Sequence, residues 1–592
     1  MHQADPITPE LLAVARSDAP ADLALANARI INVFSGEIIT GTILIHQRRI
    51  AAVLSGGEPY RSLRTADCAG SFVAPGFIDA HMHVESTMMP PSEFVTLASP
   101  HGTTGVVLDP HEIANVLGIP GIRALMDNAR GVPLHCMFAA SSCVPSCHLE
   151  TSGARLEAAD LAPLFDDDRV VALAEMMNFP GAALGDPGVL AKINLGLTRR
   201  IVDGHAPGLT GRWLQAYAGA GISSDHECTR IDEAREKLRA GIRIFIRQGS
   251  AARNLEALLP LITDATRSRF CFCTDDRHPA DLKIEGHIDH VVRLAIAGGL
   301  DPVAAITIGS FNTAQHYRQR DRGAVAPGYF ADLIVFDDLK APRPRQVYFE
   351  GALVAEHGNY LPIPSNPAQA AKKFPASAVR LPPNLTEASF RVPAPKDAHT
   401  HPQAPPRIRV IGMDPHQLVT EHLTMDASVK DGAIVPDIGR DLLKMAVIER
   451  HKGGGNIGLG FVKGFGLKRG AIASTVGHDA HNLAIVSTND ADMLAAARAL
   501  SQAGGGQCAV VDGRVLSLLP LPIAGLMSDQ PSETLIKQQH ALHEATRTLG
   551  CPHADPFMPL SFMPLPVIPQ LKLSDLGLVD VEKFALVGLV VS

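Results

Sequence analysis

Histidine and carboxylate side chains in the middle of the chain have the types and spacing to bind divalent metal ions. His81 and His83 stand two residues apart at the end of the apolar run FIDAHMH. Residues two apart on a β-strand point to the same side, so both imidazoles can bind one ion while Met82 faces away. Such ligands suit zinc, iron or manganese. A bound ion lowers the pKa of its water toward neutrality and generates hydroxide, which predicts a metal-dependent hydrolase.

Further groups of the same kind end later apolar runs: Glu175 the fourth, His205 the fifth, His226 the sixth and Asp275 the eighth. A carboxylate such as Glu175 can bridge two ions, so these residues suffice for a two-metal site. The ligand set predicted from the sequence is His81, His83, Glu175, His205, His226 and Asp275.

The His-x-His spacing alone is a weak indication, because His399 and His401 share it. That second pair lies in a proline-rich segment, follows no apolar run, and is interpreted as solvated surface. Taken singly, His205 or His226 could be a hydrogen-bonded structural histidine, and Glu175 a salt-bridge partner. The prediction depends on several such residues ending successive runs.

Eight apolar runs position these residues. They cover residues 77–83, 105–112, 133–142, 170–177, 199–205, 221–227, 242–250 and 269–276. Continuous apolar runs suit strands buried on both faces, as in a parallel sheet. Eight of them, with helical stretches between, predict a (β/α)₈ TIM-like barrel, whose functional groups lie at the carboxyl ends of the strands.

The pattern of apolar and polar residues changes on both sides of the barrel. This change predicts an α/β protein of several domains. Alternating apolar and polar residues before and after the barrel indicate one β-sandwich built from both flanks. Proline and alanine then mark a linker. The predicted parts are 1–75 (N-terminal segment and first part of the sandwich), 76–320 (metal-dependent hydrolase barrel), 321–360 (second part of the sandwich), 361–405 (linker) and 406–592 (α+β C-terminal domain).

Composition excludes several classes of protein. The 592 residues carry 53 basic and 61 acidic side chains, a net charge of −8, which offers no basic face to nucleic acid. The first thirty residues lack the basic start and following apolar run that would indicate a signal peptide. The sequence also lacks a charge-free apolar stretch long enough to span a bilayer. The nine cysteines lack the spacing of zinc or disulfide frameworks. We therefore expect a cytoplasmic enzyme with buried thiols.

The motifs resemble a known family. PGFIDAHMHVES resembles the first-strand motif of the amidohydrolase superfamily, with Glu175 where many members carry a carboxylated lysine. From about residue 22 to the end, the chain is similar to the bacterial adenine deaminase family. This closer resemblance rests on HVESTMMPP, TTGVVLDPHEIANVLG, SSCVPS, LAEMMNFPG, DGHAPGL, IRQGSAARN, CTDDRHP, STVGHDAHNL and PFMPLSFMPLPVIP. One departure is Gln248, where some relatives would have Glu.

The resemblance implies hydrolysis of adenine to hypoxanthine and ammonia, a step of purine salvage, by a metal-bound hydroxide. It implies two divalent ions per chain on the six ligands named above, manganese or iron ahead of zinc, and a homodimer or larger homo-oligomer. As a hypothesis, hydroxide attacks C6, and Asp275 takes the proton of the attacking water and passes it to the leaving amine. His226 and His205 hold the second ion. Glu112 is a candidate acid for N1; alternatively it is a carboxylate stabilised by a helix N-terminus.

Two further segments are candidates for contact with the substrate. Arg247, Ser250 and Ala251 lie in a loop of small residues that would let a flat ring approach the backbone, although the loop could be a plain turn. The C-terminal segment with His478, Asp479 and His481 is interpreted as a lid over the barrel mouth; a further metal or proton-transfer element and a hydrogen-bonded turn are the alternatives.

Two other functions stay open at this stage. The barrel could hydrolyse another nucleobase or cyclic amide, as dihydroorotases and imidazolone hydrolases do, which ammonia release from a panel of such compounds would decide. It could also be an assembly scaffold that has lost its metals. The scaffold hypothesis predicts missing ligands, whereas all six candidates are present.

Overall fold

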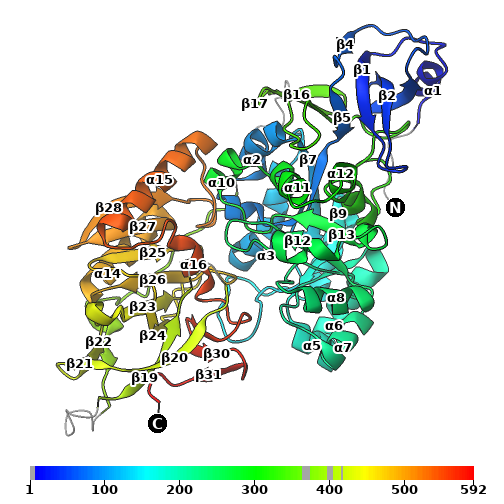
Figure 1. Ribbon diagram of the computed structural model, residues 1–592. Helices are drawn as coiled ribbons and strands as arrows, with labels where there is room; N and C mark the ends of the chain where they lie inside the picture. The colour runs from blue at the N-terminus through cyan, green and yellow to red at the C-terminus, as the bar shows by residue number, and fades with distance from the viewer. Residues whose placement is uncertain (1–6, 363–373, 396–404, 415–417, 592) are drawn as a thin grey trace.

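The computed structural model describes residues 7–362, 374–395, 405–414 and 418–591 (Figure 1). Its central part contains eight short parallel strands, one at each of the predicted apolar runs. They are β6 (Phe77–Met82), β7 (Thr103–Leu108), β8 (His135–Ala140), β9 (Val170–Met176), β10 (Val202–Gly204), β11 (Ser224–Asp225), β12 (Arg243–Arg247) and β13 (Phe270–Cys273).

These strands form a barrel in two hydrogen-bonded arcs, β6 to β10 and β11 to β13. The arcs meet where β10 packs beside β11 and where β13 packs beside β6. The second junction is bridged by Asp275, whose N–H donates to the His81 carbonyl at 3.0 Å and whose carbonyl accepts from the His83 N–H at 3.1 Å. Every residue of β6, β7 and β9 is buried, as expected for strands covered on both faces. The predicted barrel is confirmed.

Helices between the strands cover the outside of the barrel (Figure 1). The longest, α3, has a break at Gly118, whose φ of 61° and ψ of −150° are not helical. The helices of this part are α2 (Pro91–Ala98), α3 (His111–Asn128), α4 (Ala158–Leu161), α5 (Phe179–Leu184), α6 (Pro187–Arg199), α7 (Gly211–Gly219), α8 (Ile231–Arg239), α9 (Leu255–Leu258), α10 (Pro279–Ile284), α11 (Ile288–Ala297), α12 (Pro302–Ile308) and α13 (Phe311–His316).

The two flanks of the barrel join in one nine-stranded sheet, preceded by helix α1 (Pro9–Ala15). β5, just before the barrel, pairs antiparallel with β14, just after it, with Val73 opposite Val335. The sheet contains β1 (Leu23–Ile31), β2 (Ile38–His46), β3 (Arg49–Ser55), β4 (Thr65–Asp67), β5 (Phe72–Pro75), β14 (Leu333–Phe336), β15 (Gln346–Phe349), β16 (Ala352–Glu356) and β17 (Asn359–Tyr360). The chain therefore leaves this sheet to form the barrel and returns to it.

The C-terminal domain, yellow to red in Figure 1, lies beside the barrel. Its largest sheet has the strand order β20-β19-β24-β23-β26-β25-β27-β28. These strands are β19 (Arg407–Gly412), β20 (Glu421–Asp426), β23 (Leu443–Ile448), β24 (Ile457–Lys463), β25 (Ala471–Ser474), β26 (Leu483–Ser487), β27 (Gly506–Val511) and β28 (Arg514–Pro520). Gly458 of β24 leaves room for a close neighbour, since an added Cβ would lie 1.9 Å from the Ser574 carbonyl oxygen.

Two three-stranded sheets and three helices complete this domain. They are β18 (Val392–Pro393), β21 (Ser428–Lys430), β22 (Ala433–Val435), β29 (Leu571–Ser574), β30 (Gly577–Asp580), β31 (Ala585–Val587), α14 (Asp490–Ala503), α15 (Ser532–Thr548) and α16 (Phe557–Phe562). β18, which falls in the predicted linker, pairs with β22. The second His-x-His pair, His399 and His401, lies outside the described residues.

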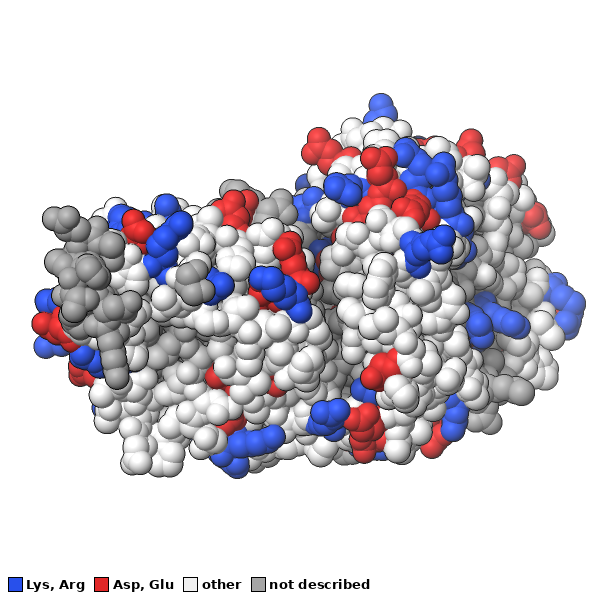
Figure 2. Space-filling view, turned by 90° about the horizontal axis from the view of Figure 1, so that it is seen from below, with Lys and Arg blue, Asp and Glu red and all other residues white. Residues whose placement is uncertain are grey.

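Hydrogen bonds tie the C-terminal domain to the loops at one mouth of the barrel. The Asn482 side chain donates to the Thr151 carbonyl at 2.8 Å, and the Ser528 N–H donates to the Met88 carbonyl at 2.8 Å. On the face drawn in Figure 2, basic and acidic side chains are interspersed. Among the helices of the described ranges, none has the length and apolar character needed to cross a membrane.

Candidate active site

The carboxyl ends of the barrel strands bring all six predicted ligands into one buried cluster. His81 and Glu175 lie in β6 and β9, and His83, His205 and His226 directly follow β6, β10 and β11. Asp275 follows β13. Each of the six side chains belongs to a buried residue, with 2 to 6% of its surface exposed. The architecture explains the grouping, because parallel strands of a barrel end at the same mouth.

Glu175 lies between two pairs of histidines. Its Oε1 is 3.5 Å from His81 Nε2 and 3.3 Å from His83 Nε2. Its Oε2 is 2.7 Å from His205 Nδ1 and 3.3 Å from His226 Nε2. One carboxylate oxygen thus faces each pair, which is the arrangement that a carboxylate bridging two metal ions requires.

Asp275 closes the cluster on the side of β13. Its Oδ1 lies 3.0 Å from His83 Nε2, and its Oδ2 accepts a hydrogen bond from Arg247 at 2.5 Å. The residue has a φ of 58°, an uncommon backbone conformation for a residue other than glycine. The paired backbone hydrogen bonds to β6 hold it there, so its carboxylate points at the histidines.

Opposite charges keep the carboxylates ionised. Burial raises the pKa of Glu175, but His226 and His205 lower it further, and the net pKa lies well below the ordinary value. For Asp275, burial likewise raises the pKa, and Arg247 and His81 lower it more. Burial lowers the pKa of His226, but Glu175 raises it well above its usual value. The cluster therefore gathers anionic oxygens and imidazoles, the donor set of a divalent cation.

Several ring nitrogens of the cluster have the geometry of metal ligands. Among the described residues, His81 Nε2 is a buried atom without a hydrogen-bond partner, and it lies 3.5 Å from both Glu175 and Asp275. A buried polar atom without a partner is costly, and a bound ion would satisfy it. His83 Nδ1 donates to the Asp109 carbonyl at 3.0 Å, which leaves Nε2 facing the cluster. The residues present therefore fit a divalent metal.

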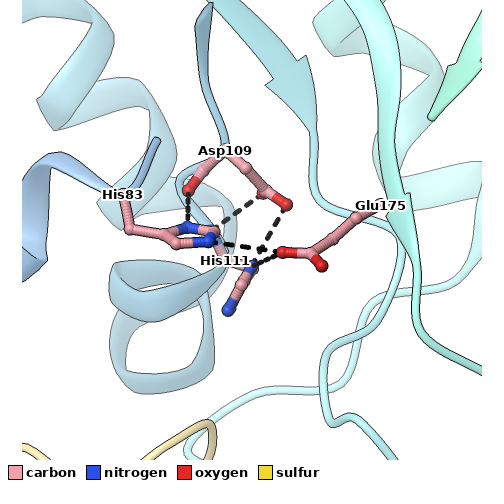
Figure 3. A group of neighbouring side chains, drawn as sticks. All are labelled: His83, Asp109, His111 and Glu175. Atoms are coloured by element: carbon pink, nitrogen blue, oxygen red, sulfur yellow. Dashed lines mark hydrogen bonds and ion pairs between the residues drawn. The ribbon is translucent and has the colours of Figure 1, made fainter. Parts of the chain in front are cut away.

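Three residues that sequence reasoning did not select extend the cluster. Asp109 and His111 follow β7, and Figure 3 shows them beside His83 and Glu175. His111 Nδ1 lies 3.1 Å from Asp109 Oδ2 and 3.6 Å from Glu175 Oε1. Glu227 lies 3.3 Å from His226 Nε2. All three stand at strand ends, so the rule that found the six ligands could have found them too.

Glu112 lies beside the cluster at the start of α3, within contact distance of two histidines of the C-terminal domain. Its Oε1 is 2.7 Å from His478 Nδ1, and its Oε2 contacts His481 Nε2. Asp479 Oδ1 lies 3.7 Å from His111 Nε2. The three residues predicted as a lid, His478, Asp479 and His481, are therefore buried against the barrel mouth.

Arg247, predicted to lie in a loop, is the last residue of β12, and Ser250 and Ala251 follow it at a cavity. The Arg247 guanidinium is buried and donates to both oxygens of Glu227, at 2.6 and 2.9 Å, as well as to Asp275. Ser250 Oγ donates to Asp281, and Ala251 packs against an apolar cluster of the C-terminal domain. Gln248, the departure noted in the sequence, is 7% exposed.

Two neighbouring spaces lie at this mouth. A cavity of about 810 Å³ is lined by the barrel residues Glu227, Arg247 and Ala251 and by Leu418 and Ile568 of the C-terminal domain. A second, of about 30 Å³, lies over the cluster, and Glu227, Arg247, Leu418 and Ile568 line both. The smaller one has room for about one water molecule. A larger ligand must widen it.

Comparison with known proteins gave matches along the chain. Residues 72–357 match the model of the amidohydrolase family, and residues 417–585 that of the adenine deaminase C-terminal domain. The chain is 48% identical over 584 residues to the adenine deaminase of Desulfatibacillum aliphaticivorans, covering 98% of this chain and 100% of that protein. It is 46% identical to the adenine deaminase of Methanothrix thermoacetophila, covering 98% of this chain and 99% of that protein.

Among solved structures, the chain is similar to the L-hydantoinase of Arthrobacter aurescens, with a TM-score of 0.44 and 15% identity. That match covers 58% of this chain and 97% of the hydantoinase. An N-acetyl-D-glucosamine-6-phosphate deacetylase of Mycobacterium smegmatis matches with a TM-score of 0.43 and 19% identity, covering 56% of this chain and all of the deacetylase.

Proposed function

Because this chain belongs to the adenine deaminase family of amidohydrolases, we propose that it hydrolyses adenine to hypoxanthine and ammonia at the buried cluster. The family and the small-molecule substrate predicted from the sequence are confirmed. The observation that carries the proposal for the site is Glu175, which presents one oxygen to each of two histidine pairs.

We propose that the cluster holds two divalent ions, manganese or iron ahead of zinc. Bound there, the ions would lower the pKa of a water molecule and so supply the nucleophile at neutral pH. Two groups of possible ligands, with atoms within 4.8 Å of one another, support two positions. One group is His81, His83 and Asp275, and the other is His205, His226 and Glu227. Glu175 lies between them.

Asp275 is the proposed proton carrier at C6. Its carboxylate is ionised and so ready to accept the proton that the attacking water releases. Passing that proton to the amino group of adenine lets it leave as ammonia. Arg247, which donates to Asp275, holds the carboxylate in this place. His226 Nε2, which lies 3.3 Å from Glu175 Oε2, would help to hold the second ion.

Glu112 is the proposed barrel residue on the side of the ring nitrogen N1. Burial raises its pKa, but His478 and His481 lower it well below the ordinary value, so the group is a carboxylate. It can assist protonation of N1 through the imidazoles that it contacts. Asp479 is the third residue of this C-terminal wall.

The large cavity is the proposed approach for adenine. Arg247, Ser250 and Ala251 line it from the barrel side, and Leu418 and Ile568 line it from the C-terminal domain. Small side chains at this loop leave the backbone accessible to a flat ring. The His478–His481 segment, interpreted from the sequence as a lid, then forms a wall of the site.

We further propose a cytoplasmic enzyme that assembles as a homodimer or larger homo-oligomer. The support for the location is that all nine cysteines are free and buried, as in a reducing compartment. The assembly is proposed from the family alone. Light scattering on the purified protein tests it.

The test of the proposed reaction is a panel of substrates given to the manganese-loaded protein. We expect ammonia and hypoxanthine in equal amounts from adenine, and no turnover of dihydroorotate or hydantoin. Ring opening of a cyclic amide without ammonia release from adenine would contradict the proposal.

A further inference from the structure

A contact between two domains lies over the candidate metal cluster. Glu112 belongs to the barrel helix α3, whereas His478 belongs to the loop between β25 and β26 of the C-terminal domain. Their side chains meet at 2.7 Å between Oε1 and Nδ1. The imidazole of His478 stacks on Phe562 of α16, with ring centroids 4.2 Å apart and planes 14° apart. Its orientation is therefore fixed on two sides.

Hydrogen bonding assigns the proton of His481. The backbone N–H of Gly477 donates to His481 Nδ1 at 3.2 Å, so this nitrogen is an acceptor and carries no proton. The proton of the neutral ring is then on Nε2, which contacts Glu112 Oε2. Burial raises the pKa of Glu112, but His478 and His481 lower it more, which favours its carboxylate form.

The other oxygen of Glu112, Oε1, lies 2.7 Å from His478 Nδ1, the distance of a close ion pair. This leaves His478 Nε2 as the free end of the ring, and within the described ranges it makes no hydrogen bond to protein. His478 lines the small space over the cluster together with His83, Glu175 and Asp275. A carboxylate that fixes one nitrogen of a histidine and leaves the other toward a reacting atom is a common arrangement in acid–base catalysis.

The charges around His478 favour its protonated form. Burial lowers its pKa, but Glu112, Asp276 and Asp479 raise it, to about 9. The neighbouring histidine, His481, is neutral, since burial lowers its pKa below the usual value. An imidazolium can therefore stand beside the site at neutral pH.

The same three residues, Glu112, His478 and His481, have ligand atoms close enough to hold a metal ion. Metal binding through His481 Nε2 would require the lone pair of that nitrogen, but the hydrogen bond from Gly477 places the proton there. The geometry therefore favours proton transfer, and a third ion is left as an outcome of the test.

We propose that His478 is a further catalytic residue, whose Nε2 gives a proton to N1 of adenine while Glu112 holds its Nδ1. The inference rests on the proposed deaminase activity. It assigns the C-terminal domain a chemical part in the reaction.

The proton balance closes over one turnover. As the oxygen of water bonds to C6, its proton goes to Asp275, and the N1 lone pair takes the Nε2 proton of His478. Asp275 then protonates the amino group, which leaves as ammonia when the C6–N bond breaks. The new C6 hydroxyl loses its proton, which restores His478, and its electron pair completes the carbonyl. The proton on N1 stays in hypoxanthine.

The test compares H478N with the wild type, both loaded with manganese, for kcat and KM on adenine and for metal content. Asparagine keeps a donor toward Glu112 but has no proton to give to N1. We expect kcat to fall by about 10²–10⁴-fold, with KM within about threefold of the wild-type value and the metal content unchanged. H553N is the matched control, because the His553 ring bonds to the Gly464 carbonyl within the C-terminal domain; it should keep wild-type kcat.

A second pair of variants keeps the test decisive if H478N folds poorly. We expect kcat to fall by the same factor in E112Q, H478Q and the double variant E112Q/H478Q. The two residues act as one unit, so their losses do not multiply. Three results would overturn the inference: kcat of H478N within threefold of wild type, losses that multiply in the double variant, or loss of one metal equivalent together with activity, which would indicate a third ion. An inactive, fully loaded wild type would instead overturn the deaminase proposal.

Discussion

Asp275 has a left-handed backbone conformation, and its carboxylate contacts both His83 and Arg247. Asparagine can keep the backbone and part of the hydrogen bonding, but it cannot accept a proton. We expect D275N to lose about 10²–10⁴-fold in kcat while retaining its metal. Steady-state ammonia release and metal analysis on one sample measure both. A variant with near-normal turnover would exclude the assigned role.

Glu175 is the residue on which the proposed two-metal site depends. Glutamine in its place has one oxygen and no charge, so it cannot present an anionic oxygen to both histidine pairs. We expect E175Q to bind less than half of the wild-type metal and to lose at least about 100-fold in turnover. The exposed Glu256 provides the control E256Q. Full metal content in E175Q would contradict the bridging position.

The cluster of candidate ligands could be predicted from the sequence because each member ends an apolar run, and a barrel brings all strand ends together. His111 and Glu227 obey the same rule but were obscured by their neighbours Glu112 and His226. The pairing of Glu112 with His478 could not be predicted. The two residues lie in different domains, and no local pattern specifies their contact.

Tyr217 of α7 ties the ends of two barrel strands. Its hydroxyl accepts from the His205 N–H at 3.0 Å and donates to the Met176 carbonyl at 2.8 Å. Y217F would remove a hydrogen bond from each of these two backbone groups. We expect the free energy of unfolding in urea to fall by about 1–3 kcal/mol. Y60F, in the N-terminal region, serves as the control. An unchanged urea midpoint would exclude this role.

The strands of the barrel were predictable from apolar runs, even where β11 spans only Ser224–Asp225. The sheet of the C-terminal domain was not. Its neighbours include β19 with β24 and β25 with β27, which are separated by other strands in the sequence. Such pairings depend on tertiary packing, which local patterns do not contain.

An ion pair joins two domains, because His278 of the barrel lies 2.9 Å from Asp555 of the C-terminal domain. Burial lowers the pKa of His278, but Asp555 raises it more, to above its ordinary 6.5. Burial raises the pKa of Asp555, but His278 lowers it more, to well below 3.8. The contribution of His278 to the free energy of unfolding is complete below pH 6.5 and is lost as the pH rises through its folded pKa. That of Asp555 is complete above pH 3.8 and is lost as the pH falls through its folded pKa.

We therefore expect D555N to be destabilised most between pH 3.8 and 6.5, by about 2 kcal/mol, and less at alkaline pH, where His278 is neutral. Chemical unfolding of both proteins at a series of pH values measures the difference. The same difference at every pH would rule out the ion pair as its cause.

Metal-dependent turnover tests the central claim most directly, namely that one buried cluster binds two ions and deaminates adenine. Metal-free protein is titrated with manganese while bound metal and ammonia release from adenine are measured on the same sample. We expect activity to rise until about two ions are bound per chain and to disappear on chelation. A folded chain that binds two ions and releases no ammonia, or one that is fully active without metal, would contradict the account.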